Sequence, residues 1–309
     1  MSRESLLREL KQHLMAVKPT EGYASGQVPT TAYTRANSPQ AAHQCFYRPL
    51  IALVLQGRKR SVIGGVATDY GAGQCATVAL DLPGVYHITE ASEEAPFLSV
   101  SLQLDRQILT ELLTTGTVPL SSDTDEPNTV ITADATDDLL DAFLRLVKLE
   151  ETPIRIPVLA PMLLREIHFL LLTGPQSDCL RHFCTNQPQT PQIVQALTHL
   201  KTHYAESLNI TELADIAGMA PSTFHKHFKA LTSLSPIQFQ KRLRLHEAQR
   251  RMLTDGCTVE TAAYTVGYES PSQFSHDTNV FSVPLPVRTF SKGKSPQTKP
   301  VQVPDIFRQ

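Results

Sequence analysis

A short segment beginning at Pro221 carries polar side chains at spacings that could place them against nucleic acid. Phe224 and Phe228 stand four positions apart, the spacing of one buried helix face, which leaves other positions to the opposite face. On that face a lysine can donate to guanine or phosphate, and serine and histidine can hydrogen-bond several base edges. The segment predicts a helix over 221–230 that either reads DNA or carries ordinary solvated residues. Its exposed face would hold Ser222, His225, Lys226 and Lys229.

The elements around this segment occur twice in the C-terminal half. The stretches 213–219 and 261–268 each give a short helix with alanine at its crowded position, followed by an apolar residue and a glycine. A glycine there permits the sharp turn that a helix-turn-helix motif needs. The second helices also match, because Pro221 and Pro271 both suit a first helical turn. The corresponding polar side chains of the second copy are Ser272, Gln273, Ser275 and His276.

A long helix from Pro236 to about Asp255 is predicted between the two copies. Ser235 and Gln238 form a capping-box signature, with proline at the first helical position. At about 1.5 Å per residue the helix spans roughly 30 Å, close to the roughly 34 Å between successive major grooves on one face of duplex DNA. We therefore expect it to hold one recognition helix in each of two adjacent grooves. Its basic residues, either a solvated face or phosphate contacts, are Lys241, Arg242, Arg244, Arg250 and Arg251.

Charge is divided unequally between the halves of this 309-residue chain, whose net charge is −2. Residues 191–309 hold 13 Lys and Arg against 9 Asp and Glu, a balance of +4. Residues 1–190 hold 15 against 21, a balance of −6. A polyanion would therefore meet the C-terminal half. The length and the 41% hydrophobic content predict two or three compact units with real cores, which excludes a lone binding motif.

The N-terminal half shows the pattern of an antiparallel β-structure. The apolar run 50–55 ends at Gly57, as a buried strand would, and the glycine pair 64–65 suits a two-residue hairpin turn. Over 98–104 apolar residues alternate with serine and glutamine, which predicts a sheet with one face in water. Short strands with almost no helical periodicity over 45–105 favour a small antiparallel barrel or sandwich.

Helical periodicity flanks these strands. Residues 1–18 mix leucines with charges, which predicts an amphipathic helix rather than a secretory signal. Three further helices are expected over 105–113, 134–149 and 156–172. The last is strongly apolar and is either an ordinary buried helix or a dimer contact. No run approaches the roughly 20 apolar residues of a membrane-spanning helix, so we expect a cytoplasmic protein with no membrane partner.

These motifs together resemble the tandem helix-turn-helix domain of the AraC/XylS transcription regulators, over about residues 191–290. A weaker resemblance links the other half to the cupin-like N-terminal domain and helical segment of one AraC subgroup. The resemblance implies an α+β chain, with a cupin-like antiparallel β-barrel and flanking helices followed by an all-α tandem helix-turn-helix domain. The motifs that carry it lie at 210–214, 218–222, 228–229, 235–236, 240–244 and 262–274, and in the other half at 47–49, 56–60, 81–83 and 164–167.

The family resemblance also assigns roles to the polar side chains. It carries base contacts onto Ser222, His225 and Lys226, while Lys229 is better placed for phosphate. The second unit departs from the family pattern, because 275–282 lacks Lys and Arg and should attract phosphate weakly. Ala220 also departs, since the family commonly has serine at this helix cap. We therefore expect the first unit to supply most of the DNA affinity.

Patterns of catalysis and metal binding are missing from the sequence. It has no nucleophile elbow and no phosphate-binding or dinucleotide-binding glycine motif. The HxH pair of catalytic cupins is also absent, and His43 and His87 are isolated. The five cysteines form no CxxC pair and are expected to be reduced thiols. We therefore expect no enzyme activity, no cofactor and no metal.

A small effector is expected to bind in the N-terminal barrel. A barrel with mixed aliphatic and aromatic interior positions can hold one small, mostly apolar molecule. The candidate contacts are Cys45, Tyr47 and His87, and Cys45 is either a reactive sensor or an inert buried thiol. An anionic effector is the alternative, with candidate contacts at Arg48, Arg58 and Arg60, which are otherwise surface charges.

The sequence thus predicts four segments. They are a cupin-like effector-binding barrel over 1–120, a helical linker or dimerisation segment over 121–190, an AraC-type DNA-binding domain over 191–291 and a flexible tail over 292–309. The expected function is sequence-specific bacterial transcription regulation. The alternatives are a DNA-binding protein whose barrel serves only for dimerisation, or a metal-free remnant of a cupin enzyme. The expected partners are double-stranded DNA, a small-molecule effector, a second copy in a homodimer and, for an activator, RNA polymerase.

Overall fold

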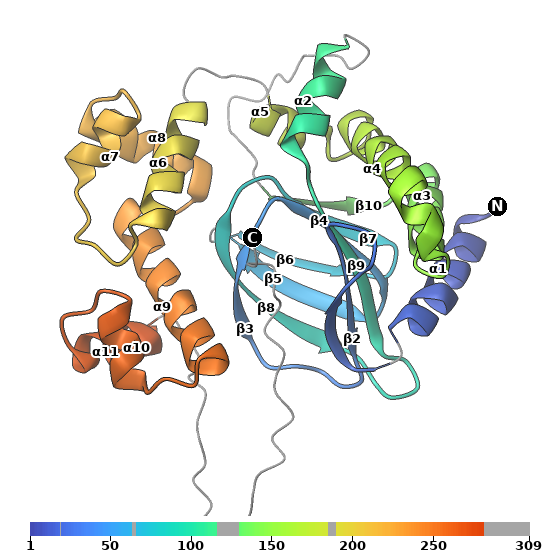
Figure 1. The fold of residues 1–309 in the computed structure, drawn as a ribbon, viewed down its shortest axis with the longest axis horizontal. Helices are drawn as coiled ribbons and strands as arrows, with labels where there is room; N and C mark the ends of the chain where they lie inside the picture. Colours follow the sequence, from blue (N-terminus) through green and yellow to red (C-terminus); the bar gives the residue numbers. More distant parts are fainter. Residues whose placement is uncertain (19, 64–65, 116–129, 185–189, 281–309) are drawn as a thin grey trace, which may run out of the picture.

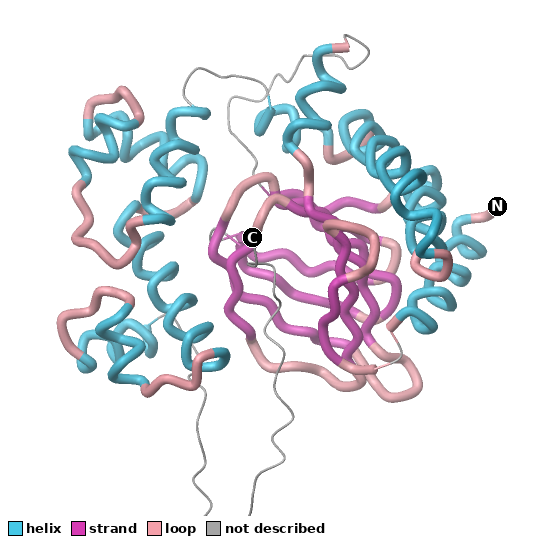
Figure 2. The backbone as a smooth tube through the Cα atoms, in the orientation of Figure 1, coloured by secondary structure: helices cyan, strands magenta, loops and turns pink. Residues whose placement is uncertain are grey.

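Two antiparallel sheets with flanking helices form the N-terminal part of the chain, and a group of helices lies beside them (Figures 1 and 2). The computed structural model describes residues 1–309 except 19, 64–65, 116–129, 185–189 and 281–309. The predicted order, an antiparallel β-domain followed by an all-α region, is confirmed. The expected tail over 292–309 lies outside the described residues.

The two sheets of the predicted antiparallel β-domain are open and do not close into a barrel. Closure requires hydrogen bonds around the whole circumference, whereas β1 and β10 are the edges of one sheet and β3 and β6 are the edges of the other. The six-stranded sheet runs β1 (Gly22–Ser25), β2 (Thr31–Ala36), β9 (Phe97–Gln103), β4 (Leu50–Gln56), β7 (Gln74–Val78) and β10 (Val130–Asp134). The four-stranded sheet runs β3 (His43–Tyr47), β8 (Leu82–Glu90), β5 (Arg58–Ile63) and β6 (Val66–Gly71).

Two local strand predictions have different outcomes. The predicted hairpin is present, because β5 pairs antiparallel with β6 up to Ile63 and Val66. The glycine pair 64–65 of its turn lies outside the described residues. The alternation in β9 does not give one wet face, since Ser99 is buried. The reason is that Ser99 shares its face with Phe97, which clusters with residues of the four-stranded sheet. The helix α1 (Arg3–Val17) packs on the six-stranded sheet, with its leucines in one cluster with Val100 and Leu102 of the other face.

The N-terminal helices follow the predicted periodicity closely. The helix α1 buries Leu6, Leu10 and Leu14, as an amphipathic helix should. The helix predicted from Asp134 begins three residues later, because Asp134 ends β10 and the Thr136 hydroxyl caps the helix by accepting from the Leu139 N–H. The remaining bounds are α2 (Arg106–Thr114), α3 (Asp137–Leu149), η1 (Pro153–Arg155), α4 (Ile156–Thr173) and α5 (Ser177–Cys184).

The helix α4 is buried on one face and exposed to solvent on the other. Leu163, Ile167 and Leu171 are buried, so the buried-helix reading holds for that face. Val158 and Met162 are 69% and 66% exposed. Within the described chain, Pro153–Thr173 alone is long and apolar enough, by length and composition, to cross a membrane. This differs from the expectation that no such run exists, although core helices pass the same test.

Six helices of the described chain make up the C-terminal part, and they reproduce the predicted repeat. The turn glycines Gly218 and Gly267 have φ of +61° and +91°, the left-handed region that favours glycine. The capping box of Ser235 and Gln238 is present at the start of the long helix. The bounds are α6 (Thr190–Thr202), α7 (Ile210–Ile216), α8 (Pro221–Thr232), α9 (Pro236–Thr254), α10 (Val259–Thr265) and α11 (Pro271–Val280).

Candidate nucleic-acid interface and regulatory sheet

The helix α8 separates a buried aromatic face from a polar face. Phe224, Phe228 and Leu231 are buried, as predicted from their spacing. Ala220 supplies no side-chain cap at the start of the helix, in agreement with its departure from the family pattern. The four side chains proposed to meet DNA all lie on the exposed positions: Ser222, His225, Lys226 and Lys229.

The helix α11 repeats this separation with fewer charges. Phe274 is buried against Tyr268, with their rings edge to face at 5.3 Å. The Ser270 hydroxyl caps the helix by accepting from the Gln273 N–H at 3.2 Å. The proposed contacts of this unit are exposed: Ser272, Gln273, Ser275 and His276.

Asp277 anchors α11 to the rest of the domain, a role that the sequence did not reveal. Its carboxylate is buried, accepts from the Lys241 ammonium at 3.1 Å and accepts from the Tyr268 hydroxyl at 3.2 Å. Burial and the Asp277 charge raise the pKa of Tyr268 well above its usual value. Lys241 is therefore held by a structural ion pair. Spacing could not show this, because the three residues come from different segments.

Arg244 does not fit the predicted phosphate contact. Its guanidinium donates to the carbonyl oxygens of Tyr204 at 2.7 Å, Glu206 at 2.7 Å and Gly267 at 2.8 Å, and also to Ala205 at 3.2 Å. These contacts use the donors that a phosphate would need. Arg244 therefore joins the loop after α6 to the turn of the second unit, instead of making the predicted contact with DNA.

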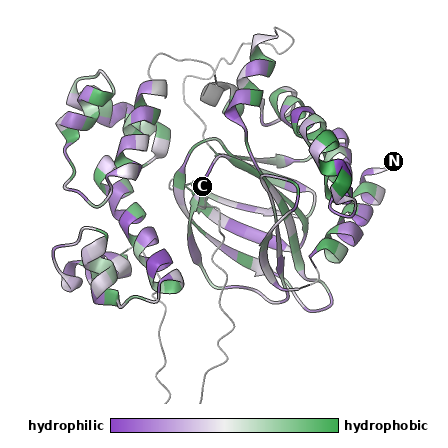
Figure 3. Cartoon of the chain, viewed as in Figure 1, coloured by the Kyte–Doolittle hydropathy of each residue, from purple (hydrophilic) through white to green (hydrophobic). Residues whose placement is uncertain are grey.

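The other basic residues of α9 are partly engaged as well. Arg250 and Arg251 both donate to the half-buried carboxylate of Glu247. Burial opposes ionisation of Glu247, but the two arginines hold its pKa below the usual value. Arg242 is half-buried, and burial lowers its pKa. Although Figure 3 shows α9 as mostly hydrophilic, few of its charges are left for phosphate.

The four-stranded sheet presents one polar, aromatic face toward the other sheet. Register pairs Cys45 with Gly84 and Tyr47 with Leu82, so these side chains share a face. The Tyr47 hydroxyl lies 3.3 Å from the Ser61 hydroxyl, which lies 3.2 Å from the Tyr70 hydroxyl. Burial raises the pKa of Tyr47 well above its usual value. A chain of three hydroxyls thus crosses the buried face of this sheet.

A single lysine stands on the same face. The Lys59 ammonium lies 3.9 Å from the centroid of the Tyr86 ring, within cation–π distance. His43, opposite Tyr86 in the register, has its pKa lowered by burial and by the Lys59 charge. Lys59 carries no signal in the sequence that separates it from Arg58 and Arg60, because the strand register that turns it inward is set by pairing with β8. The face therefore combines aromatic rings, hydroxyls and one cation.

For two of the predicted effector contacts, Cys45 and His87, the structure changes the interpretation. Burial raises the pKa of the Cys45 thiol to about 12, and its sulfur donates weakly to the Gly84 carbonyl. This favours the inert thiol over the reactive sensor. His87 pairs with Arg60 in the register and follows Tyr86, so it points to the face opposite Cys45 and Tyr47. His87 is therefore misplaced as a contact of the same effector.

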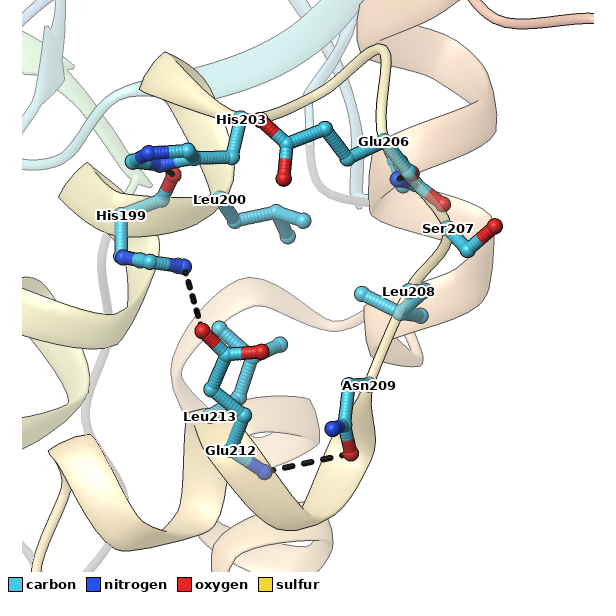
Figure 4. A pocket seen from close by; sticks show the side chains of 10 residues that line it. His199, Leu200, His203, Glu206, Ser207, Leu208, Asn209, Glu212 and Leu213 are labelled. Carbon is cyan, nitrogen blue, oxygen red and sulfur yellow. Dashed lines mark hydrogen bonds and ion pairs between the residues drawn. The ribbon is translucent and has the colours of Figure 1, made fainter.

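A small pocket lies among α6, α7 and α9, outside both candidate sites (Figure 4). His199 and His203 stack with ring centroids 4.1 Å apart, and His199 lies 3.4 Å from the Glu212 carboxylate. Gln240 donates to the Tyr204 and Glu206 carbonyls. In the part of the chain that the structure describes, no group of three or more His, Cys, Asp or Glu is arranged to hold a metal.

Comparisons with known proteins agree with this division of the chain. Residues 27–179 match the family model of the AraC-type transcriptional regulator N-terminus, and residues 213–280 match a helix-turn-helix domain. An AraC-like transcription regulator of Streptomyces lividans is 34% identical over 85 residues, which are 28% of this chain and 28% of that protein. The transcriptional activator RhaS of Pectobacterium carotovorum is 35% identical over 85 residues, 27% of this chain and 30% of its own. The match thus spans about three tenths of these relatives.

Solved structures resemble this chain over both its sheets and its C-terminal helices. ToxT from Vibrio cholerae, in a structure with a bound unsaturated fatty acid, superposes with a TM-score of 0.55 at 10% identity, over 84% of this chain and 92% of that one. A second ToxT structure, with a naphthalenyl butenoic acid bound, gives a TM-score of 0.56 at 10% identity, over 83% and 94%. At this identity the likeness concerns the fold alone. The two family models and the helix-turn-helix relatives carry the assignment: this chain belongs to the AraC family of transcriptional regulators.

Proposed function

We propose that the protein binds two adjacent major grooves of promoter DNA through α8 and α11 and so regulates transcription in the bacterial cytoplasm. The observation that carries the proposal is the pair of exposed polar faces on helices that each follow a glycine turn, with the 19-residue helix α9 between them. Residues 191–291 would form the DNA-binding unit and 1–120 the sensing unit. The role is regulatory rather than catalytic.

Footprinting of the full chain on DNA from its own gene neighbourhood tests this function. Two protected major-groove segments, about 10 base pairs apart, are expected if both recognition helices engage. A single protected segment would contradict the two-groove geometry, and the absence of any protection at low salt would contradict DNA binding. Because Arg244, Arg250, Arg251 and Lys241 are engaged within the protein, the salt dependence should be shallow for a protein of this size.

We propose that the effector site is the inner face of the four-stranded sheet. Cys45, Tyr47 and Tyr86 line it, and Lys59 supplies a cation that can receive an acidic group. Both ToxT ligands named above are carboxylic acids, which supports a small, mostly apolar acid as the effector. The alternative is an N-terminal part that only dimerises and binds no ligand.

Thermal unfolding in the presence of a probe acid separates these alternatives. A ligand that binds only the folded state raises the melting temperature by mass action, so an unsaturated fatty acid should stabilise the wild-type chain. Lys59→Met should abolish most of this shift, while Lys11→Met, on α1, should leave it unchanged. If a panel of acids produces no shift with the wild-type chain, the dimerisation-only alternative is favoured.

We propose that α4 forms the homodimer contact. Ile154 of η1 and Val158 and Met162 of α4 stand four positions apart and are 90%, 69% and 66% exposed. A bare apolar stripe on a helix can pair with its own copy about a twofold axis. Sedimentation of Val158→Glu should show a monomer where the wild type is dimeric. For an activator, RNA polymerase would be the further partner at the promoter.

A further inference from the structure

An aromatic side chain of an edge strand lies at the junction between the two parts of the chain. Phe46 of β3 is buried, and its ring lies edge to face against Phe239 of α9 at 5.7 Å. The same ring is 6.2 Å from the ring of His246, two turns farther along α9. Figure 1 shows β3 as the strand of its sheet next to α9. Phe46 thus inserts between two residues of the helix that spaces the DNA-binding units.

The aromatic contact continues from α9 into the first recognition helix. Phe239 meets Phe228 of α8 edge to face at 5.6 Å, and Phe228 meets Phe224 at 5.5 Å. These are the geometries that aromatic pairs prefer. Phe224 and Phe228 form the buried face opposite Ser222 and Lys226. A row of four rings therefore runs from the edge strand to the back of the proposed DNA-reading face.

An ion pair holds the same junction from the side. The Lys201 ammonium of α6 lies 3.0 Å from the Asp81 carboxylate, just before β8. It also lies 5.7 Å from the centroid of the Phe46 ring. The ion pair and the aromatic contact therefore lie at one place, beside the neighbouring strands β3 and β8 of the four-stranded sheet.

The two helix-turn-helix units differ in their connection to the sheets. Phe46, Phe239 and Phe228 belong to one continuous hydrophobic cluster that includes the sheets and the first unit. The second unit has a separate cluster built around Tyr268 and Phe274. A change in the sheets can therefore reach α8 within one continuous buried cluster, whereas a route to α11 has to pass from this cluster to a second one, for example through the partly buried Tyr204.

We propose that β3 couples the inner face of the sheet to the first recognition helix, with Phe46 as a positioning residue. The proposal rests on the proposed function and deepens it. Alternate residues of β3 point to opposite faces: Cys45 and Tyr47 face the proposed effector site, and Phe46 faces α9. A ligand that binds the inner face of β3 therefore also restricts Phe46 on its other face. Phe46 in turn packs on α9, which supports α8. The polar faces of α8 and α11 stay exposed with Phe46 docked, so docking does not cover them. We therefore expect the support that Phe46 gives to α8 to favour DNA binding.

Hydrogen exchange of the full chain without DNA tests the coupling independently of DNA binding. Phe46→Ala should increase exchange in α8 and in the first half of α9 and leave α10 and α11 unchanged. The matched control is Phe97→Ala, which removes the same side chain from a buried cluster of the sheets that does not include α8 or α9. An unchanged α8 in Phe46→Ala, or equal increases in α8 and α11, would overturn the proposal.

DNA binding supplies the second readout. Phe46→Ala should weaken the affinity for promoter DNA roughly tenfold, by loss of protection at the groove that α8 occupies. Phe46→Leu, which keeps an apolar side chain, should restore most of the affinity. Tighter binding by Phe46→Ala would show that docking inhibits, and would overturn the proposal. If the wild-type chain binds no DNA, the proposed function fails, while the exchange result still decides the coupling.

Discussion

The guanidinium of Arg244 donates to the carbonyl oxygen of Gly267 at 2.8 Å and so joins the long helix α9 to the turn of the second helix-turn-helix unit. The same side chain reaches the loop after α6 through the Tyr204 and Glu206 carbonyls. One residue thereby fixes the position of the second unit relative to α6. The positive charge of Arg244 suggested a phosphate contact in the sequence, but in the structure its guanidinium is hydrogen-bonded to backbone carbonyls of the same domain.

Arg244→Ala should destabilise the second unit. Removing the guanidinium leaves carbonyl oxygens without their donors, which costs about 2 kcal/mol in the free energy of unfolding. Urea unfolding followed by circular dichroism measures this change. Arg8→Ala, an exposed position of α1, is the control and should change stability little. Equal stability of the two variants, with reduced DNA affinity for Arg244→Ala alone, would return Arg244 to the phosphate contacts.

The two turn glycines should differ in their tolerance of alanine. At Gly218 a Cβ would meet no atom within 4 Å, so only the positive φ is strained, at a cost of about 1 kcal/mol. At Gly267 a Cβ would also collide with the Ala205 carbonyl oxygen. The turn at Gly267 and the loop at Ala205 would then have to move apart. Gly267→Ala should therefore be clearly less stable than Gly218→Ala in thermal unfolding. The reverse order would show that the close approach of Ala205 is not maintained in solution.

The first recognition helix should contribute more affinity than the second. Lys226→Ala removes an exposed cation that can donate to guanine, and a good base contact is worth about 1–3 kcal/mol. His276→Ala removes a residue from α11, a helix that contains no lysine or arginine to attract phosphate. Fluorescence anisotropy with labelled promoter DNA should show the larger loss for Lys226→Ala. Equal or reversed losses would contradict this order.

Cys45 should react slowly with thiol reagents. Burial raises its pKa to about 12, and the same is true of Cys75, so the nucleophilic thiolate is scarce at neutral pH. Cys45 and Cys257 are both partly exposed, so the raised pKa of Cys45, rather than its exposure, should make Cys257 the first of the two to be alkylated. Mass spectrometry after timed treatment with iodoacetamide measures the order. Modification of Cys45 ahead of Cys257 would revive its role as a reactive sensor.

Stability should fall as the pH is lowered toward 4, through His246. Burial lowers the pKa of His246 to about 4, against about 6.5 in an unfolded chain. Between these values the unfolded chain binds the proton and the folded chain does not, so the free energy of unfolding decreases as pH falls. The contribution is about 3 kcal/mol at most.

Urea unfolding at pH 7, 6 and 5 measures this slope. His246→Leu cannot take up the proton and should show a shallower dependence than the wild type over the same range. Parallel curves for the two proteins would exclude His246 as the cause. The Glu247 carboxylate, whose pKa is depressed, takes up its proton at a lower pH. Measurements between pH 7 and 5 therefore report on His246 rather than on Glu247.

Local patterns in the sequence determined most of the elements. The spacing of Phe224 and Phe228 placed the buried face of α8, and Ser235 with Gln238 marked the start of α9, because caps and helical periodicity depend on residues within one or two turns. The repeat of glycine and proline likewise revealed both helix-turn-helix units. The polar faces of α8 and α11 followed from the same local spacing.

Tertiary structure decided what local spacing cannot contain. Arg244 and Lys241 look like free cations in the sequence, but carbonyls and a carboxylate from other segments engage them. Strand register, set by pairing across the sheet, turns Lys59 to the face of Tyr47 and turns His87 to the opposite face. The junction at Phe46 joins residues almost 200 positions apart in the chain, and such long-range packing depends on how whole elements meet.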